Sequence, residues 1–583
     1  MMGGQAAKAG LSKDLSWTAC HLTSTTPVDC DFSAGTMQVG QSYMVAAHNP
    51  ATIKQDLLRF RVNKAASYKV YGVAADQSWA EVPSDKLCYT KTEDNWRGSN
   101  VDECELYIKA EVAPQSSAFF KIEVVADEDS TEARQSLLVP NTVISNDHMT
   151  LEYMGQDEND RALFRHTDTK NGLPSQNLAF SLQRYTPTEY SGAYIFQQNL
   201  EVPKKQYSKF DRIETYRAPN TGVDAFVVYF EGEQFSKWGK PLLREQYTAL
   251  IRVLPDSMAF EWEVQMHGIP HIPLDGADGH EVVVNWELLD FDNNNTWYTD
   301  SNGLEMQKRI LNFRPDYTLD TKEFAASNYY PINSALAMRN IETGVQLTIM
   351  NDRSQGGSVL SNGSVEIMQN RRLHHDDCRG VGEALNERNE LGVGIQVNTR
   401  YFLQFFNYKT DESIQRKVQL AVDEPVQFFV AAAQEGQDQL GPKCPAPEVA
   451  VPEFDGDLKI HLLPNGRNDM LIRLENLADL FDGTPDETPM FDLKQYCLNL
   501  FAANYGGQVQ LDIKERTLSD NQDYDEMAKK KFKWPTESGD GTVTYPADKE
   551  PNAVVALQPQ RIRLFRVRFA PLVPTPPGEE FLQ

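Results

Sequence analysis

The segment Arg371–Gly380, RRLHHDDCRG, concentrates residue types that can bind metals or transfer protons: three arginines, two histidines, two aspartates and one cysteine. It could form a metal site, an acid–base centre or a charged turn. Adjacent side chains on a strand point to opposite faces, so His374 and His375 would not readily share one ion. Zinc-binding histidine pairs prefer wider spacings such as H-x-x-x-H. We therefore expect a solvated charged loop here.

The two aspartates of this segment are expected to act on nearby arginines. Guanidinium groups make charge-assisted hydrogen bonds to carboxylates, so the aspartates would brace Arg371, Arg372 or Arg379. Cys378 has no partner base marked by the pattern, and we interpret it as a buried or free thiol rather than a nucleophile.

Other patterns that carry chemistry are absent or have a structural explanation. The sequence contains no phosphate-binding glycine loop, no H-E-x-x-H and no G-x-S-x-G. In DRSQGGS (352–358) the glycines indicate a tight turn or close backbone approach, and TDSNG (299–303) indicates a turn. AKKKFKW (528–534) is expected to be a solvated face or an interdomain contact.

The elements that must position any site belong to a large, acidic chain. With 583 residues the chain is too long for one core, and we expect three or four domains. Its formal net charge is −27, which disfavours binding to nucleic acid or to anionic membranes. Such a surface is typical of a lysosomal, vacuolar or secreted protein, although simple solubility would also explain it.

The seven cysteines include no C-x-x-C pair, so zinc ribbons and thioredoxin-type sites lack support. Cys20 with Cys30, and Cys88 with Cys104, are near enough in sequence for local disulfides. The odd count leaves at least one thiol free or paired between chains.

Two N-glycosylation sequons begin at Asn294 and Asn362. They are compatible with a secretory route. The start of the chain has no apolar run typical of a signal peptide, and no apolar run of about 20 residues predicts a transmembrane helix. If the protein is secretory, this start would not be its true beginning.

Strand patterns dominate the chain. AFFKIEVVAD, DAFVVYFEGE, TALIRVLP, MAFEWEVQMHG, VQLTIM, RYFLQFFNY and VQFFVAAA are rich in β-branched and aromatic residues. Helical patterning occurs only near Ala6–Leu15 and, weakly, around Asp525–Lys531. Successive strands without helices between them favour antiparallel sandwiches over a parallel α/β sheet. The glycine- and proline-rich segment after residue 433 reads as a linker.

Several motifs, in order along the chain, resemble glycoside hydrolase family 38, and in particular the C-terminal half of lysosomal-type α-mannosidases. They are CHLTSTTPVDC (20–30), SGAYIF (191–196), FEWEVQMHGIP (260–270), YTDSNGLEMQKR (298–309), NYYPINS (328–334), DRSQGGSVLSNGSVEIMQNRRLHHDDCRGVGEAL (352–385) and LQPQRIRLFRVRF (557–569). Each motif alone would be weak, whereas the ordered set is specific and runs along nearly the whole chain.

The resemblance implies a mostly β fold. We expect a small β-sandwich, a large galactose-mutarotase-like supersandwich, a terminal β domain and a short helical remnant at the N-terminus. The implied boundaries are the end of a helical bundle at 1–18, the small sandwich at 19–134, the supersandwich at 135–433, a linker at 434–456, the terminal β domain at 457–569 and a proline-rich tail at 570–583.

The resemblance also implies a function shared between two polypeptides. Family 38 enzymes hydrolyse α-mannosides of N-glycans with retention, using two carboxyl groups and zinc. Those groups lie on an N-terminal catalytic domain that nothing in this chain matches. We therefore expect no catalytic residue and no metal site on this chain, and zinc on a separate N-terminal catalytic chain. Expected partners are that chain and a mannose-containing oligosaccharide, within a homo-oligomer of the assembled enzyme.

Two residues of this chain would still reach the active site. By their positions in the SGAY and DD-x-RG stretches, the family's tyrosine and arginine correspond to Tyr194 and Arg379. A phenol can hydrogen-bond a sugar hydroxyl, and a guanidinium can hold a hydroxyl or steady a carboxylate. The structural interpretations are a core aromatic and an internal salt bridge.

One departure from the family pattern affects the neighbouring sugar contacts. After SGAYIF this chain has QQNL, where the family usually has arginine, proline, asparagine and glycine. The alternative function is a non-catalytic carbohydrate-binding or structural β-sandwich protein that kept this scaffold.

Overall fold

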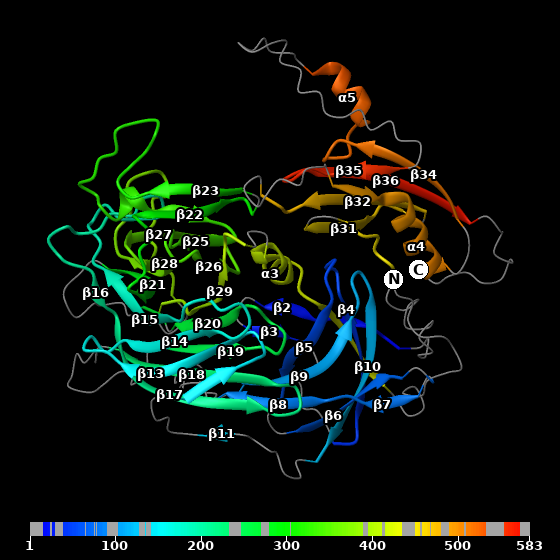
Figure 1. Ribbon diagram of the computed structural model, residues 1–583, viewed down its shortest axis with the longest axis horizontal. Helices are drawn as coiled ribbons and strands as arrows, with labels where there is room; N and C mark the ends of the chain where they lie inside the picture. Colours follow the sequence, from blue (N-terminus) through cyan, green and yellow to red (C-terminus); the bar gives the residue numbers. More distant parts are fainter. Residues whose placement is uncertain are drawn as a thin grey trace.

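The structure is a computed structural model that describes residues 15–23, 26–29, 39–63, 66–74, 76, 78–89, 103–126, 134–135, 142–232, 247–266, 268–269, 279–303, 305–388, 394–410, 414–433, 449–454, 457–466, 468–479, 489–505, 509–531 and 553–571. Strands make up most of this part of the chain, as the alternating patterns predicted. They form three bodies, which Figure 1 shows with the supersandwich on the left and the terminal domain at the upper right.

The first body is a small sandwich of two antiparallel sheets. One sheet has the order β1-β30-β4-β10-β6-β7 and the other β5-β9-β8. Apolar side chains that alternate along β4, β5, β9 and β10 fill the space between the sheets, with Phe60 and Phe428 ring to ring. The strands are β1 Thr18–Ala19, β4 Ser42–His48, β5 Gln55–Val62, β6 Ser67–Val73, β7 Trp79–Glu81, β8 Ser84–Tyr89, β9 Glu103–Val112, β10 Ser117–Val125 and β30 Gln427–Ala433; β2 His21–Thr23 pairs with β3 Thr26–Asp29.

The second body is the large supersandwich. A ten-stranded sheet of order β11-β17-β18-β19-β20-β29-β26-β25-β22-β23 faces a nine-stranded sheet of order β12-β13-β14-β15-β21-β28-β27-β24, to which β16 is attached. The core between them is rich in aromatic rings, including Trp262, Trp286 and Trp297, all fully buried.

The supersandwich strands are β11 Arg134–Gln135, β12 Thr142–Ser145, β13 Met149–Gln156, β14 Ala162–Asp168, β15 Gln176–Tyr185, β16 Lys205–Gln206, β17 Ser208–Ala218, β18 Val223–Gly232, β19 Tyr247–Val253, β20 Phe260–Met266, β21 Gly279–Leu289, β22 Thr296–Ser301, β23 Glu305–Ile310, β24 Tyr330–Ile332, β25 Ala335–Arg339, β26 Val345–Asn351, β27 Gln355–Ser361, β28 Ser364–Leu373 and β29 Val397–Asn407, with the 3-10 helix η1 at Ala326–Asn328.

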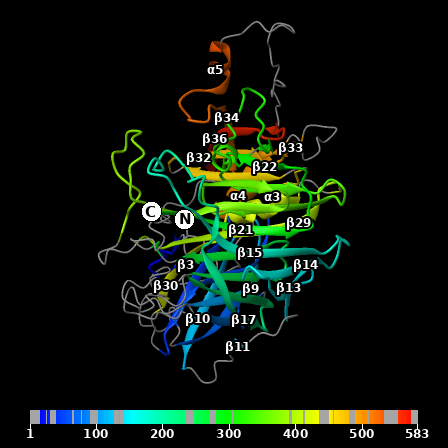
Figure 2. The ribbon, with the colours of Figure 1, turned by 90° about the vertical axis from the view of Figure 1, so that its left-hand side faces the viewer.

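The third body is the terminal β domain. Its sheet has the order β31-β32-β36-β34, and helix α4 packs on it through apolar residues three and four positions apart. Its elements are β31 Leu458–Pro464, β32 Asp469–Asn476, β33 Met490–Asp492, α4 Leu493–Tyr505, β34 Val509–Arg516, α5 Tyr524–Lys530, β35 Val554–Ala556 and β36 Ile562–Pro571. Figure 2 shows this domain at one end of the molecule.

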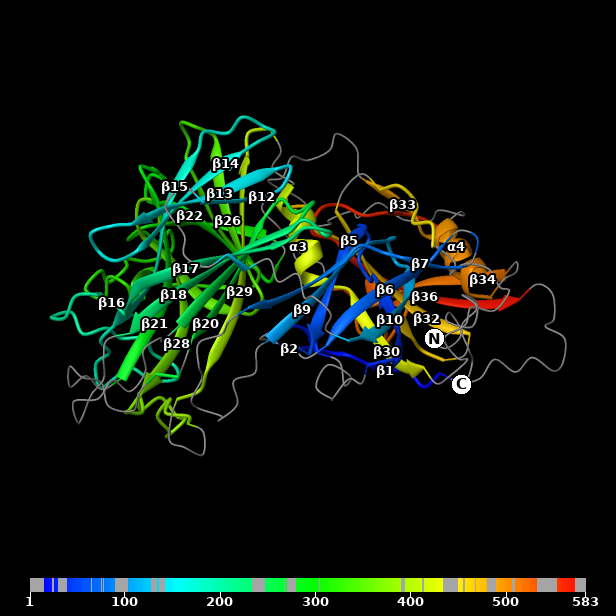
Figure 3. The same ribbon diagram turned by 90° about the horizontal axis from the view of Figure 1, so that it is seen from below.

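Strand β30 crosses the expected boundary between the first two domains. The sequence placed residues 427–433 in the middle domain, but β30 pairs with β4 and β1 of the small sandwich. Helix α3 (Ile414–Asp423) connects β29 of the supersandwich to β30 and lies between the two bodies in Figure 3. The chain therefore returns to its first sandwich after the supersandwich is complete.

The small sandwich packs directly on the outer face of the ten-stranded sheet. Leu87, Tyr89 and Tyr107 form one apolar cluster with residues of β17, β18 and β19. The carboxylate of Asp85 accepts hydrogen bonds from the backbone and hydroxyl of Thr221, at 2.7 Å each, in the β17–β18 turn. These contacts fix the small sandwich against the supersandwich.

The two helical predictions have different outcomes. The weak pattern around Asp525–Lys531 is confirmed by α5, whereas Ala6–Leu15 lies outside the described residues except for Leu15. In the described part of the chain, no helix is long and apolar enough to cross a membrane.

Candidate functional site

The carboxylate of Asp377 joins the two loops that carry the candidate residues. Its Oδ2 accepts the backbone N–H groups of Tyr194, at 2.6 Å, and Ile195, at 3.1 Å. Its Oδ1 accepts the backbone N–H of Arg379 at 3.1 Å. Burial would raise the pKa of the Asp377 carboxyl, but these N–H donors and Arg379 outweigh it, so the pKa lies below its ordinary value. An ionised, buried carboxylate therefore sets the position of both backbones.

Gly192 allows the first loop to approach Asp377. A Cβ at this position would lie 2.6 Å from the Asp377 Cβ and 2.7 Å from its backbone nitrogen, closer than side chains can come. The glycine of SGAY is therefore required by packing between two loops that are distant in sequence.

Below these loops, a buried ion pair fastens the segment to the nine-stranded sheet. Glu281 of β21 is fully buried and is paired with Arg371 of β28, whose Nη2 lies 3.0 Å from the Glu281 Oε1. The same nitrogen donates to the Ile195 carbonyl at 2.9 Å, and the Ser191 hydroxyl donates to Glu281. Phe196 completes the anchor, with its ring between those of Tyr185 and Tyr329 at centroid distances of 5.3 and 5.1 Å.

Tyr194 and Arg379 both lie on the exposed side of this assembly. The Tyr194 residue is 67% exposed, so the interpretation of a core aromatic is excluded. Arg379 is also exposed, and its Nη1 lies 3.4 Å from the Cys378 carbonyl oxygen. The structure thus presents a phenol and a guanidinium from adjacent loops, both accessible to a sugar or to another polypeptide.

Tyr190 was not singled out from the sequence but lies on the same loop and is 58% exposed. A hydrogen bond to Glu189 raises the pKa of its phenol, and nearby Cys378 contributes to the shift. The signal available in the sequence was an aromatic residue directly before SGAY.

Of the arginines that the two aspartates were expected to brace, Arg379 does interact with Asp377, through its charge and its backbone N–H. Arg371 and Arg372 have other partners. Arg371 pairs with Glu281, and the Arg372 Nε donates to the Asn386 Oδ1 at 2.8 Å. The Asp377 carboxylate, which is buried between the two loops, accepts three backbone N–H groups. Cys378 is a free, exposed thiol.

The metal interpretation of HHDD gains no support from the described residues, which contain no group of three or more histidine, cysteine, aspartate or glutamate side chains able to hold a metal ion. The expectation that zinc lies on a separate catalytic chain stays a prediction.

Gln197, the first residue of the departure from the family pattern, is held by its own surroundings. Its Nε2 donates to the Glu323 Oε1 at 2.8 Å, and its Oε1 accepts from the Thr188 hydroxyl at 2.6 Å. Both ends of the amide are engaged within the protein, so this side chain is not poised to contact a ligand.

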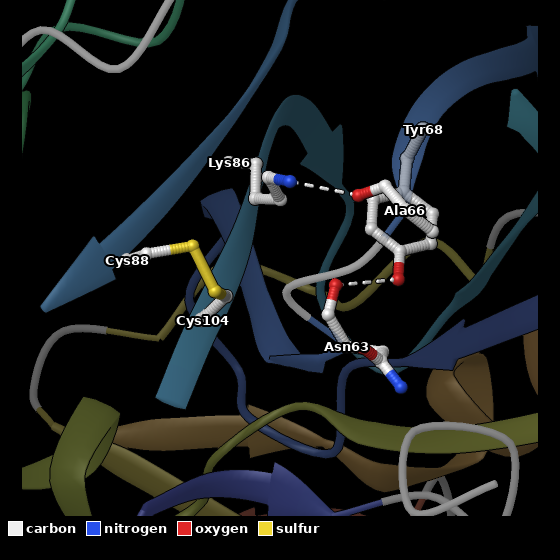
Figure 4. The surroundings of a disulfide bond; sticks show 6 residues. All are labelled: Asn63, Ala66, Tyr68, Lys86, Cys88 and Cys104. Atoms are coloured by element: carbon white, nitrogen blue, oxygen red, sulfur yellow. Dashed lines mark hydrogen bonds between the residues drawn. A yellow bond between two sulfur atoms is a disulfide. The ribbon is translucent and has the colours of Figure 1, made fainter. Parts of the chain in front are cut away.

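The disulfide expected between Cys88 and Cys104 is present. The two residues are paired across β8 and β9, and Figure 4 shows the bond beside Lys86, which donates to the Ala66 carbonyl. Cys20 is also disulfide-bonded, while its expected partner Cys30 lies outside the described residues.

The two candidate glycosylation residues, Asn294 and Asn362, are exposed at the tips of neighbouring turns. The Asn362 Oδ1 accepts the backbone N–H of Asn295 at 2.9 Å, which leaves its amide nitrogen pointing away from that contact. Glycosylation itself stays a prediction at both positions.

The fold and the loops joined by Asp377 define a multidomain β-sandwich protein built around a supersandwich. Residues 144–379 match the family described as "Glycosyl hydrolases family 38 C-terminal domain". This match agrees with the resemblance that the ordered motifs indicated.

Several curated proteins are similar to this chain over the same region. The chain is 30% identical over 387 residues to a lysosomal alpha-mannosidase of Bos taurus, covering 65% of this chain and 35% of that protein. It is 28% identical over 419 residues to an alpha-mannosidase of Arabidopsis thaliana, covering 70% of this chain and 38% of that protein. The chain thus spans little more than a third of the length of these relatives.

A solved structure shows the same fold. It is a protein in glycosyl hydrolase family 38 from Enterococcus faecalis, with a TM-score of 0.51 and 14% sequence identity. The match covers 92% of this chain and 59% of that one. At this identity the likeness concerns the fold alone, and it extends over all three bodies.

Proposed function

We propose that this chain is the C-terminal portion of an α-mannosidase and completes the active site of a separate, zinc-bearing N-terminal catalytic chain. The observation that carries the proposal is the carboxylate of Asp377, which holds Tyr194 and Arg379 on adjacent loops with both side chains exposed. The relatives named alpha-mannosidase support it, since the chain matches about a third of their length.

The substrate would be an α-mannoside of an N-glycan, hydrolysed with retention. In such a reaction one carboxylate attacks the anomeric carbon and another carboxyl group protonates the leaving oxygen. Both carboxyl groups and the zinc belong to the partner chain in this proposal. Tyr194 would donate or accept a hydrogen bond at a sugar hydroxyl, and Arg379 would hold a hydroxyl or steady a carboxylate of the partner.

The same relatives and the disulfide also support a cellular compartment for this chain. A disulfide between Cys88 and Cys104 persists in an oxidising compartment, and several relatives are named lysosomal. We propose a lysosomal, vacuolar or secreted location, and assembly of the two-chain enzyme into a homo-oligomer.

Arg379→Ala in the assembled enzyme tests the proposal. A lost charge-assisted hydrogen bond is worth about 1.5–3 kcal/mol, so kcat/KM for an aryl α-mannoside should fall by about ten- to a hundredfold. The melting temperature should change little, because Arg379 is exposed. The control is Arg568→Ala on β36, whose side chain is 58% exposed and lies in the terminal domain. Equal activity of the two variants, or a loss of activity that follows a loss of stability, would contradict the proposed role.

A non-catalytic protein that binds carbohydrate is the second candidate. The observation that favours it is the pair of exposed rings, Tyr190 and Tyr194, which offer a sugar-stacking surface without any catalytic group. This candidate predicts oligosaccharide binding by the purified chain, no hydrolysis of an aryl α-mannoside, no stoichiometric zinc and no second polypeptide on a native gel. A tightly bound zinc-containing chain in the purified protein would exclude it.

A further inference from the structure

Two arginines contact the same buried tyrosine at one edge of the supersandwich. The Cζ atoms of Arg309 and Arg314 lie 4.2 and 4.1 Å from the centroid of the Tyr330 ring, and Tyr330 is 4% exposed. Arg309 is on β23 and Tyr330 is on β24, and these strands end the ten-stranded and the nine-stranded sheets. Figure 1 shows β23 with β22 at the upper border of the supersandwich. None of the three residues belongs to the loops of Tyr194 and Arg379.

A tight turn brings the two arginines together. Ile310 and Phe313 form an antiparallel bridge, and the Phe313 N–H donates to the Ile310 carbonyl at 3.2 Å. Asn312, within the turn, has a φ of 57°. Arg309 and Arg314 are the residues next to this bridge, so they are neighbours across the turn. Like charges placed opposite each other in this way are destabilising, and the chain holds the two cations together against their repulsion.

No carboxylate compensates these two charges. Within the part of the chain that the structure describes, neither guanidinium has an ion pair, and their one hydrogen bond runs from the Arg309 Nε to the Thr299 hydroxyl at 3.0 Å. Burial lowers the pKa of Arg309, the Tyr330 phenol opposes this shift, and the charge of Arg314 lowers the pKa further. In a chain with 83 acidic and 56 basic residues, two adjacent unpaired arginines leave a positive site open for an anion.

An anion can reach the ends of both side chains. Arg309 and Arg314 are half-buried, and the Arg314 Nε is enclosed by protein. The four Nη atoms of the pair make no hydrogen bond to a described residue and, unlike that Nε, none of them is enclosed. These Nη atoms are therefore open to solvent, and their N–H groups can donate to the oxygens of a ligand.

Exposed aromatic residues follow in the same segment. Phe313 and Tyr317 are 52% and 59% exposed. Burial raises the pKa of Tyr330, the two arginines lower it, and the Tyr317 phenol raises it. Because Tyr317 acts on this ionisation, its hydroxyl is close to the site and can also donate to an anion. The exposed rings offer contact area to an organic group that carries the anion.

We propose that Arg309 and Arg314 bind a phosphate group through their Nη atoms, with the Tyr317 hydroxyl as a further donor. Guanidinium groups suit phosphate because each presents a planar fork of N–H donors to two oxygens. A phosphate dianion also compensates both positive charges at once. The source is free phosphate or the phosphate ester of a sugar, which present the same oxyanion. The inference goes beyond the proposed function and does not depend on it.

Isothermal titration calorimetry measures the binding, on the chain as purified together with any polypeptide that accompanies it. The ionic strength is kept low because salt screens an exposed site, and the pH is about 7.5, where a phosphate monoester is mostly dianionic. We expect saturable binding of inorganic phosphate and of glucose 6-phosphate, whereas uncharged glucose should bind weaker than glucose 6-phosphate by about tenfold or more. No saturable binding of either phosphate, or equal binding of glucose and glucose 6-phosphate, would overturn the proposal.

The comparison of the two phosphates identifies the source. Tighter binding of glucose 6-phosphate than of inorganic phosphate supports an ester whose organic part contacts the exposed rings of Phe313 and Tyr317. Equal affinities support free phosphate as the ligand, held by the two arginines alone.

Arg309→Met and Arg314→Met test the location. Methionine keeps an unbranched apolar side chain over the Tyr330 ring while removing one cation. Each variant should bind phosphate weaker by about tenfold or more, because it loses a charge-assisted contact. Arg314→Met should melt no lower than wild type, since it relieves the repulsion between the two arginines. A fall in melting temperature in both variants that accounts for the lost binding would mark the pair as structural and overturn the proposal.

The matched control is Arg212→Met on β17. The Arg212 Cζ lies 3.8 Å from the Tyr229 ring centroid, but its Nη1 is paired with the Asp211 Oδ2 at 2.7 Å. This arginine also covers a tyrosine ring, but its charge is already compensated, so the variant should bind phosphate as wild type does. Wild-type affinity in both Arg309→Met and Arg314→Met, or an equal loss in the control, would place the phosphate elsewhere and refute the assignment.

Discussion

At the scale of single residues, His166 on β14 shows how the core constrains ionisation. Its ring is stacked on Phe405, with centroids 4.3 Å apart, and its Nδ1 is buried without a hydrogen-bond partner. Burial lowers the pKa of this histidine to about 4, although Asp168 nearby acts in the opposite direction. The folded chain therefore keeps the ring neutral at pH values where the unfolded chain protonates it.

This difference predicts an acid-sensitive contribution to stability. Between about pH 6.5 and pH 4 the unfolded state binds the extra proton, so the free energy of unfolding falls with decreasing pH by about 3 kcal/mol from this group. His166→Phe keeps the ring stacking and removes the titration. Between pH 7 and pH 4, the free energy of unfolding of this variant should therefore fall by about 3 kcal/mol less than that of the wild type. Urea unfolding at the two pH values measures it. The control is His375→Phe, at an exposed position, and an equal pH dependence of the two variants would contradict the assignment.

Residue roles at the candidate site were only partly predictable from sequence. The positions of Tyr194 and Arg379 follow from motif order, and the structure exposes both side chains. The task of Asp377 was not predictable, because an aspartate beside arginines suggests ion pairs while its real partners are backbone N–H groups about 180 positions away. Glu281, the true partner of Arg371, carried no local signal among 83 acidic residues.

At the scale of elements, strands were easier to predict than helices or pairings. AFFKIEVV, DAFVVYFEG and RYFLQFFN correspond to β10, β18 and β29, because β-branched and aromatic residues suit a buried pleated sheet. Helix α3 was missed because its buried residues include Gln415, Arg416 and Gln419, which hide the apolar period. The pairing of β30 with β4 was also missed, since register across so long a separation leaves no local pattern.

A buried charge cluster links strands of different bodies. Arg252 of β19 is fully buried, and its Nη2 lies 2.6 Å from the Glu105 Oε1 on β9 and 2.9 Å from the Glu263 Oε2 on β20. The Arg252 Nε also donates to the Tyr107 hydroxyl at 3.2 Å. This one guanidinium therefore connects the small sandwich to the ten-stranded sheet through strands rather than loops.

Arg252→Met should destabilise the chain strongly. The substitution leaves buried carboxylates without their cation, a change that typically costs about 3–5 kcal/mol. Arg165→Met is the matched control, because the Arg165 side chain is 40% exposed and its ion pair with Glu152, at 3.4 Å, should contribute under about 1 kcal/mol. Urea unfolding compares the two, and similar midpoints would show that the buried cluster does not hold the bodies together.

At the scale of the whole molecule, the three bodies are held by specific polar contacts as well as by apolar packing. The terminal domain reaches the small sandwich through the Tyr496 hydroxyl, which donates to the Gln115 Oε1 at 3.1 Å. It reaches the supersandwich through Asp479, whose Oδ2 accepts the backbone N–H of Met306 at 2.6 Å and lies 3.4 Å from the Arg416 Nη2 on α3. Both charged side chains are about 1% exposed.

Asp479→Ala should therefore loosen the terminal domain while leaving its own sheet intact. The substitution removes a buried carboxylate from beside the Arg416 guanidinium and the acceptor of the Met306 N–H. The core between α4 and the terminal sheet contains neither group. Limited proteolysis should release a stable terminal fragment faster from this variant than from wild type. Asp512→Ala, at an exposed position on β34, is the control and should release it at the wild-type rate. If the Asp479 variant were cleaved no faster than this control, apolar packing alone would hold the terminal domain in place.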